Sequence, residues 1–220
     1  MSTAIAETAA VPKPRLRGWL HAAYLPVALV GAMLLLASAE GVSARAAVGV
    51  FGLTMIGLYG ISSAYHVGRW SDRARAIWSR CDGAMIQVFI AGSFTPIAYH
   101  SLSGGWRTWS LAVAWTVAIT GAVIALSPLK APRWLSTAGY IAVGWLGVVP
   151  FTQIIAALPW EGSALVALGG VLYTIGGVVY ARRWPDPFPT WFGFHEVFHV
   201  FVVAGSTAHY VAIWRYVLPS

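Results

Sequence analysis

The sequence predicts an all-α membrane protein, a seven-transmembrane helix bundle with the N-terminus in the cytoplasm and the C-terminus outside. Three observations predict this class. Hydrophobic residues make up 58% of the 220 residues and charged residues only 10%, whereas soluble domains carry about 25% charged residues. Seven segments are apolar and long enough to cross a bilayer. Basic residues alternate between the two sides of those segments.

Each predicted span holds about 20 mostly apolar residues, the length that crosses roughly 30 Å of hydrocarbon. Short connections rich in charge, proline and tryptophan separate the spans. Pro26, Pro96 and Pro150 fall inside spans, and we expect them to bend their helices. The seven predicted spans are residues 20–39, 46–67, 82–100, 108–126, 135–157, 163–181 and 193–216.

Lysine and arginine are concentrated in the N-terminal tail and in the second, fourth and sixth connections. These regions hold eleven basic residues, and the other side holds only Arg45, Arg107 and Arg215. Since Lys and Arg favour the cytoplasmic side, this bias sets the predicted orientation. The eleven are Lys13, Arg15, Arg17, Arg69, Arg73, Arg75, Arg80, Lys130, Arg133, Arg182 and Arg183.

One transmembrane domain is expected over residues 19–220, preceded by a disordered cytoplasmic tail over residues 1–18, which are polar and contain prolines. A secretory signal with a cleavage site at Ala37-Ser38-Ala39 is an alternative. The apolar run from Leu20 to Ala39 is longer than the roughly 7–15-residue core of such signals. The sequence lacks a recognisable internal repeat, the main sign of an inverted-repeat transporter.

The formal net charge of +7 does not indicate nucleic-acid binding. The basic residues lie in short clusters between apolar spans, where anionic lipid headgroups explain them. We therefore expect membrane lipids as partners and no nucleic acid. Cys81 is the only cysteine, which excludes an internal disulfide. Nothing in the sequence indicates an oligomeric state.

The most informative motif is His195-Glu196-Val197-Phe198-His199, at the start of the last span. Residues four apart lie on one face of a helix, so both imidazoles point the same way. Two imidazoles in a lipid-embedded helix are costly unless they have a use. We expect a divalent metal to be that use, and zinc accepts two or three histidine ligands.

Further candidate ligands lie at the same predicted depth. His66 ends the second span, and Asp82 starts the third, so both lie near the cytoplasmic edge with His195 and His199. A single buried histidine is usually a hydrogen-bonded core residue. Three histidines and an aspartate from three helices at one level instead predict a metal site within a helix bundle. Three protein ligands leave zinc an open position, and Asp82 is the candidate base there.

Two neighbouring polar residues have alternative interpretations. Ser62 lies one turn before His66, where it could bond a ligand or substrate, or simply the carbonyl four residues back. His195-Glu196-Val197-Phe198-His199 also fits H-E-x-x-H, the metalloprotease motif in which Glu196 would be the general base. We instead expect Glu196 to face the headgroups or to pair with Arg182 or Arg183.

Taken together, the motifs resemble those of the hemolysin III family, bacterial members of the superfamily of adiponectin and progestin receptors and, more distantly, alkaline ceramidases. The resemblance covers all seven spans. Gly83 departs from the family pattern, in which a histidine often follows the aspartate. The matching segments are Ser62 to His66, Asp82 with Ile90-Ala91-Gly92-Ser93-Phe94-Thr95-Pro96, and Phe192 to His199 with Ala204-Gly205-Ser206 and His209-Tyr210.

The resemblance implies Zn²⁺ held by His66, His195 and His199, with Asp82 reaching the metal through a water molecule and Ser62 beside it. It implies a protein of the bacterial cytoplasmic (inner) membrane that hydrolyses lipid amides or acts in membrane lipid and fluidity homeostasis. Asp82 and Ser62 are then the catalytic candidates. The alternatives are a non-catalytic lipid-responsive receptor or sensor with structural zinc, or a pore-forming haemolytic protein.

Overall fold

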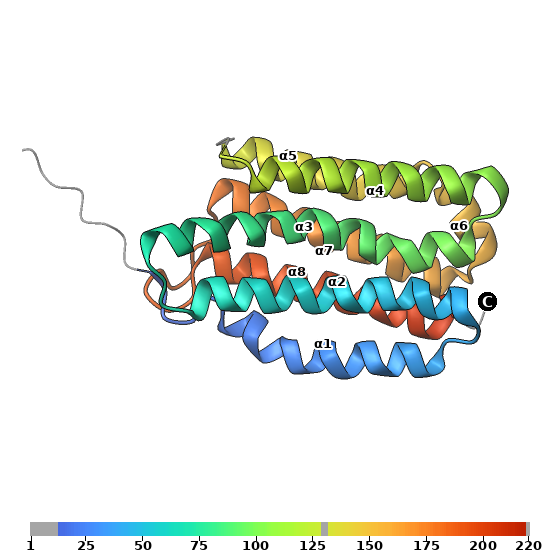
Figure 1. Ribbon diagram of the computed structural model, residues 1–220, viewed down its shortest axis with the longest axis horizontal. Coiled ribbons are helices and arrows are strands. Elements are labelled where there is room, and N and C mark those ends of the chain that lie inside the picture. Colours follow the sequence, from blue (N-terminus) through green and yellow to red (C-terminus); the bar gives the residue numbers. More distant parts are fainter. Residues whose placement is uncertain (1–12, 129–131, 219–220) are drawn as a thin grey trace, which may run out of the picture.

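The computed structural model describes residues 13–128 and 132–218, and Lys130 and the tail residues 1–12 lie outside these ranges. The described residues are mostly helical, and an isolated bridge between Phe188 and Phe192 is their only β-type pairing. In chain order (Figure 1) the helices are α1 (Trp19–Ser38), α2 (Val42–Val67), α3 (Asp72–Ser101), α4 (Gly104–Leu126), α5 (Arg133–Gly144) with a 3-10 turn (Trp145–Val148), α6 (Phe151–Ala157), α7 (Trp160–Arg182) and α8 (Phe194–Ala212) with a π-helical end (Ile213–Val217).

Six helices of the described chain are long and apolar enough to cross a membrane. These are α1, α2, α3, α4, α7 and α8 with its π-helical end. The segments Arg133–Val148 and Phe151–Ala157 pass the same test as a pair, with a bend of 51° between them. The described chain therefore has six candidate spans, or seven if the bent pair crosses as one.

The bent pair replaces the fifth predicted span, residues 135–157. Pro150 lies at the break; it has no backbone N–H to donate, and its ring clashes with the preceding turn of a helix. Gly144 and Gly147 lie shortly before it, and glycine lowers helix propensity. The expected bend at Pro150 is present, and it is sharp enough to divide the span into two short helices.

Helix α3 is longer than its apolar part. It begins at Asp72, ten residues before the predicted start, because the hydroxyl of Ser71 accepts a hydrogen bond from the backbone N–H of Ala74 (3.4 Å) and caps the helix. Hydropathy reports only the lipid-facing length of a helix and misses such polar extensions. Asp82 therefore lies well inside α3, which corrects the prediction that it starts the helix.

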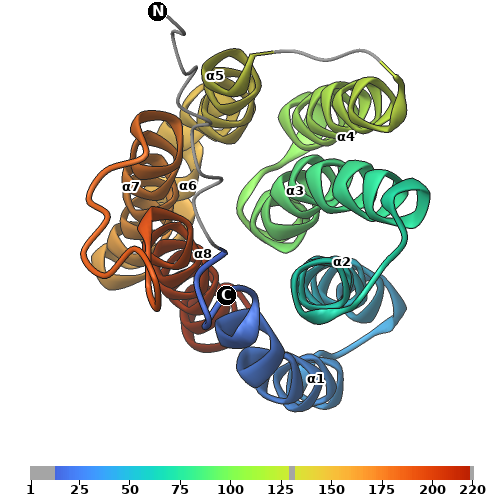
Figure 2. The ribbon, with the colours of Figure 1, turned by 90° about the vertical axis from the view of Figure 1, so that its left-hand side faces the viewer.

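Seen end-on (Figure 2), α1, α2, α3 and α4 follow one another along one side of the bundle, and α8, α7 and α5 lie along the other. Large apolar side chains form a buried core between the helices, among them Leu35, Phe51, Met55, Tyr59 and Ile97. Large apolar side chains also cover the outside, as at Val27, Met33, Leu53, Trp109 and Val123. An outer surface this apolar is expected against lipid.

Small residues let neighbouring helices approach closely. A methyl group added at Gly92 of α3 would overlap the side chain of Thr54 on α2. One at Gly176 of α7 would lie 2.8 Å from Cβ of Phe201 on α8. Close backbone approach through small residues is the usual way in which membrane helices pack.

Residues 13–18, which we placed in the tail, are packed against the segment that precedes α8. The backbone N–H groups of Arg15 and Leu16 donate to the carbonyls of Thr190 and Trp191, both at 3.0 Å. The guanidinium of Arg15 also lies 4.3 Å from the ring centroid of Trp191. This N-terminal segment therefore leads into α1 along a fixed path at the end of the bundle where α8 begins.

We predict that Gly92→Ala destabilises the protein by about 1–3 kcal/mol, because the added methyl forces α2 and α3 apart. Gly60→Ala is the matched control, since a methyl at Gly60 meets nothing within 4 Å. Thermal unfolding in detergent would measure both variants. Equal melting temperatures for the two variants would contradict the packing described here.

Candidate metal centre

Helix α8 presents two histidines in its first two turns. His195 and His199 lie one turn apart with ring centroids 4.6 Å from each other. The helix begins directly after Gly193, and the proline-rich connection before it brings the chain round from α7. Tyr180 of α7 packs against His195 with ring centroids 5.5 Å apart. The two imidazoles therefore share one face, as the four-residue spacing predicts.

His66 reaches the same point from the last turn of α2. Its ring centroid is 4.6 Å from that of His195 and 5.4 Å from that of His199. The Nε2 atoms of His66 and His195 are 3.1 Å apart. One ring nitrogen from each of the three histidines lies within 4.8 Å of the other two. The structure thus brings His66 together with His195 and His199, which follow it by more than 120 residues.

The spacing of the His66 and His195 nitrogens fits a single metal ion. Two ligand atoms bound at about 2.0–2.1 Å to one tetrahedral zinc ion lie about 3.3 Å apart, close to the spacing of the two Nε2 atoms. His199 is buried, and its Nδ1 has no hydrogen-bond partner. Three imidazoles, two of them buried and that of His195 half-buried, are a donor set that zinc accepts readily.

Asp82 lies beside the histidines from α3. One of its carboxylate oxygens is 3.5 Å from Nε2 of His66, and the side chain is 19% exposed. That separation is too long for a strong hydrogen bond, and it leaves the carboxylate free to bond a small molecule next to the metal-competent nitrogens. Asp82 is the one carboxylic acid among the five predicted site residues, and it lies next to His66.

Ser62 does not bond its own helix. Its hydroxyl shares a hydrogen bond of 2.9 Å with Nδ1 of His21 on α1. The next residue shows the alternative, since the hydroxyl of Ser63 donates to the carbonyl of Tyr59 at 2.5 Å. The interpretation of Ser62 as a residue bonded to its own helix is therefore wrong, and its hydroxyl is held by another helix beside the histidines.

His21 is the site residue whose importance the sequence did not reveal. Its ring is stacked on that of His199, with centroids 3.6 Å apart and planes 9° from parallel. Its side chain is 2% exposed. The sequence carried one signal, because the first span contains His21 and no Asp, Glu, Lys or Arg, and a histidine among apolar residues in a membrane is costly unless it has a use. A fourth imidazole is thus present, supplied by α1 and not by position 83.

The other histidines lie elsewhere. The Nε2–H group of His209 donates a hydrogen bond of 3.1 Å to the carbonyl of Val166 on α7. His100 lies in the last turn of α3, at the far end of the bundle from the cluster. Among the described residues, the metal-competent group consists of His66, His195 and His199, and His209, His100 and Cys81 are outside it. Position 83, where relatives often have a histidine, faces α5 here, since a methyl group added at Gly83 would lie 3.5 Å from the hydroxyl of Tyr140.

Glu196 is buried and engaged on both oxygens. One oxygen pairs with the guanidinium of Arg17, and the other accepts from the backbone N–H of Gly193 at 2.7 Å, which caps α8. The prediction that Glu196 faces the headgroups or pairs with Arg182 or Arg183 is therefore wrong. The partner comes from the N-terminal segment, which hydropathy alone does not place. This engagement argues against Glu196 as the base of a metalloprotease motif.

Cationic side chains surround this end of the bundle. The ammonium group of Lys13 donates to the backbone carbonyl of His66. Partial burial lowers the pKa of Lys13, and the nearby charges of Arg75 and Arg17 lower it further. Arg133 lies over the ring of Tyr180, with its guanidinium carbon 4.8 Å from the centroid. Together with Asp82 and the histidines, these groups line one end of a cavity.

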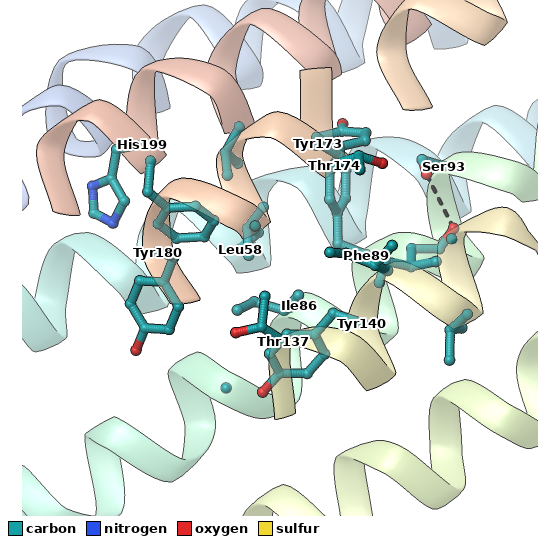
Figure 3. Close-up of a pocket in the computed structure, with 18 of the residues that line it drawn as sticks. Leu58, Ile86, Phe89, Ser93, Thr137, Tyr140, Tyr173, Thr174, Tyr180 and His199 are labelled. Carbon is teal, nitrogen blue, oxygen red and sulfur yellow. Dashed lines mark hydrogen bonds between the residues drawn. The ribbon is translucent and has the colours of Figure 1, made fainter. Parts of the chain in front are cut away.

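The cavity has a volume of about 1010 Å³ and runs between the helices of the bundle. Figure 3 shows His199 and Tyr180 at one end and Phe89, Ser93 and Thr174 farther along it. Its walls beyond the histidines are largely apolar, as at Ile86, Phe94, Ile97, Trp145, Val166 and Phe198. The volume is at the upper end of the roughly 300–1,000 Å³ typical of small-molecule sites.

We predict that Glu196→Ala lowers stability by about 1–3 kcal/mol, because it leaves the buried N–H of Gly193 without its acceptor and Arg17 without its partner. Glu40→Ala, at an exposed position, is the control. Thermal unfolding should show a lower melting temperature for Glu196→Ala alone. The double variant with Arg17→Ala should recover part of the loss, because it no longer leaves the guanidinium unpaired. Equal melting temperatures for Glu196→Ala and Glu40→Ala would contradict the capping and pairing role of Glu196.

Comparison with known proteins agrees with the motifs and the fold. Residues 9–210 match a family described as "Haemolysin-III related". The chain is 31% identical over 181 residues to Hemolysin-3 of Bacillus cereus, covering 81% of this chain and 78% of that protein. It is 30% identical over 167 residues to the Hemolysin-3 homolog of Bacillus subtilis, covering 76% and 75%. Over 206 residues it is 23% identical to the human Monocyte to macrophage differentiation factor, covering 92% and 83%. These matches confirm the resemblance seen in the motifs, and the chain is a multi-pass membrane protein that belongs to the haemolysin III-related family.

Proposed function

We propose that this protein is a zinc-dependent hydrolase of lipid amides, acting inside the membrane. The observation that carries the proposal is the placement of three metal-competent histidines, with the Asp82 carboxylate 3.5 Å from His66, at one end of a large apolar cavity. Zinc sites with three protein ligands keep an open position, which is the catalytic arrangement. A purely structural zinc site usually fills all four positions with protein ligands.

The cavity favours a lipid substrate. Its apolar walls continue from the histidines to Phe94, Ile97 and Trp145, deep between the helices. An acyl chain in this space would bring a bond near its polar end to the histidines. The long apolar chain and its junction with a polar headgroup are features of a lipid amide such as a ceramide.

The chemistry divides between the metal and the chain. A zinc ion held by His66, His195 and His199 would supply Lewis acidity toward an amide carbonyl and a nearby water molecule. Asp82 takes a proton from the attacking water and returns it to the leaving nitrogen, so that an amide and water give a carboxylic acid and an amine. When Nδ1–H of His21 donates to it, the hydroxyl of Ser62 keeps its own proton to donate a hydrogen bond to the oxygen on which negative charge develops.

We propose that the site lies near the cytoplasmic face of a bacterial inner membrane. The support is the distribution of Lys and Arg, which is strongly biased to the end of the bundle that holds the histidines. A site at this depth lies where acyl chains meet headgroups. Hydrolysis of a membrane lipid there would change the composition and fluidity of the bilayer.

We predict that the purified protein binds about one zinc ion per chain. His199→Ala should lower zinc content by a large factor, because it removes one of the three ligands. His100→Ala is the matched control, since it replaces a histidine of α3 outside the metal-competent group. Elemental analysis would measure both variants. Equal zinc content in the two would contradict the assignment of His199.

We predict that Asp82→Asn lowers the rate of lipid-amide hydrolysis about 10²–10⁴-fold with zinc content retained, because it removes the general base. Asp72→Asn, at the exposed start of α3, is the control for Asp82. Ser62→Ala should also slow hydrolysis, with Ser63→Ala as its control. Chromatography of fatty acids released from ceramide-like substrates would measure the rates.

Absence of turnover by zinc-loaded wild-type protein on a panel of N-acyl lipids would contradict the hydrolase proposal. It would leave the alternative of a lipid-responsive sensor with structural zinc. Leakage of dye from liposomes would instead indicate the pore-forming alternative.

A further inference from the structure

We propose that His21 is a positioning residue of the metal centre, which orients the imidazole of His199 and the hydroxyl of Ser62. The inference rests on the proposed zinc site and assigns a part of it to α1. It is carried by three contacts of the first turn of α1 with the site, made through Gly18 and His21.

The first contact is the stack between His21 and His199. Parallel rings at a centroid distance of 3.6 Å leave His199 no room to rotate out of its plane on that side. The plane of an imidazole fixes the direction in which its nitrogen lone pair points. His21 therefore holds His199 in one orientation before a metal ion binds, which reduces the ordering that binding requires.

The second contact is the hydrogen bond between Nδ1 of His21 and the hydroxyl of Ser62. Ser63 donates to a carbonyl of α2, but Ser62 bonds His21 of α1 and makes no such bond. Tyr59 packs edge-on against His21, with centroids 4.9 Å apart and planes at 85°, and restricts the ring further. His21 is thus fixed by α2 while it stacks on α8.

The third contact places α1 against His66. Gly18 has a φ of 86°, in the left-handed region that favours glycine, and a methyl group there would overlap Cβ of His66. The start of α1 therefore lies directly against His66, while His21 stacks on His199. The ring of His21 is outside the metal-competent group itself, so its role is to orient and not to bind.

Three variants of His21 separate the two interactions. His21→Ala removes both the stack and the hydrogen bond. His21→Phe keeps a flat ring against His199 and loses the hydrogen bond. His21→Asn places an amide near the position of Nδ1 and loses the stack. His100→Ala is the control, as a histidine of α3 remote from the site.

The measurements are zinc affinity by competition with a chelator and the visible absorption spectrum of the cobalt-loaded protein, which reports ligand geometry. Melting temperatures without metal identify variants that are misfolded. Loss of an outer contact to a metal ligand typically lowers affinity 10–100-fold, so we expect a loss of about that size for His21→Ala with a changed cobalt spectrum. His21→Phe and His21→Asn should each restore part of the affinity, and His100→Ala should match wild type.

The proposal is overturned if folded His21→Ala protein has the zinc affinity and cobalt spectrum of wild type. If His21→Ala does not fold, the same result with His21→Phe and His21→Asn together overturns it. If wild-type protein binds neither zinc nor cobalt, the proposed metal centre itself is excluded. This result is distinct from a failure confined to the His21 variants.

Discussion

The convergence of three imidazoles at one end of an apolar bundle is the constraint around which this structure is organised. Polar side chains among membrane helices are costly unless their hydrogen-bonding or ligand capacity is used. Here the Nε2 atoms of His66 and His195 lie only 3.1 Å apart, although the two residues are 129 positions apart in the sequence. Close packing at small residues holds the helices on either side, with Gly92 at the contact of α3 with α2 and Gly176 at the contact of α7 with α8.

The polar groups around the histidines form a continuous set of contacts based on the N-terminal segment. Lys13 bonds the carbonyl of His66, Arg17 pairs with Glu196, and His21 bonds Ser62 and stacks on His199. The segment therefore joins α1, α2 and α8 at the level of the site. It satisfies the charge of Glu196, and it leaves Asp82 as the carboxylate available to a molecule in the cavity.

Much of this arrangement could be predicted from the sequence, because helix spacing and depth are encoded locally. The four-residue spacing of His195 and His199 and the span ends at His66 and Asp82 placed these groups at one level. The role of His21 and the pairing of Glu196 with Arg17 could not be predicted in this way. Both depend on the path of residues 13–18, which is set by hydrogen bonds to Thr190 and Trp191 and carries no hydropathy signal. The early start of α3 was missed for a similar reason, since Ser71 caps a polar extension.

The central claim is that one zinc ion is held by His66, His195 and His199 beside Asp82. X-ray absorption at the zinc edge of the purified wild-type protein tests it most directly. The claim predicts about one zinc per chain with imidazole nitrogens at about 2.0–2.1 Å and no sulfur ligand. Metal-replete protein without bound zinc, or with zinc bound through Cys81, would contradict it.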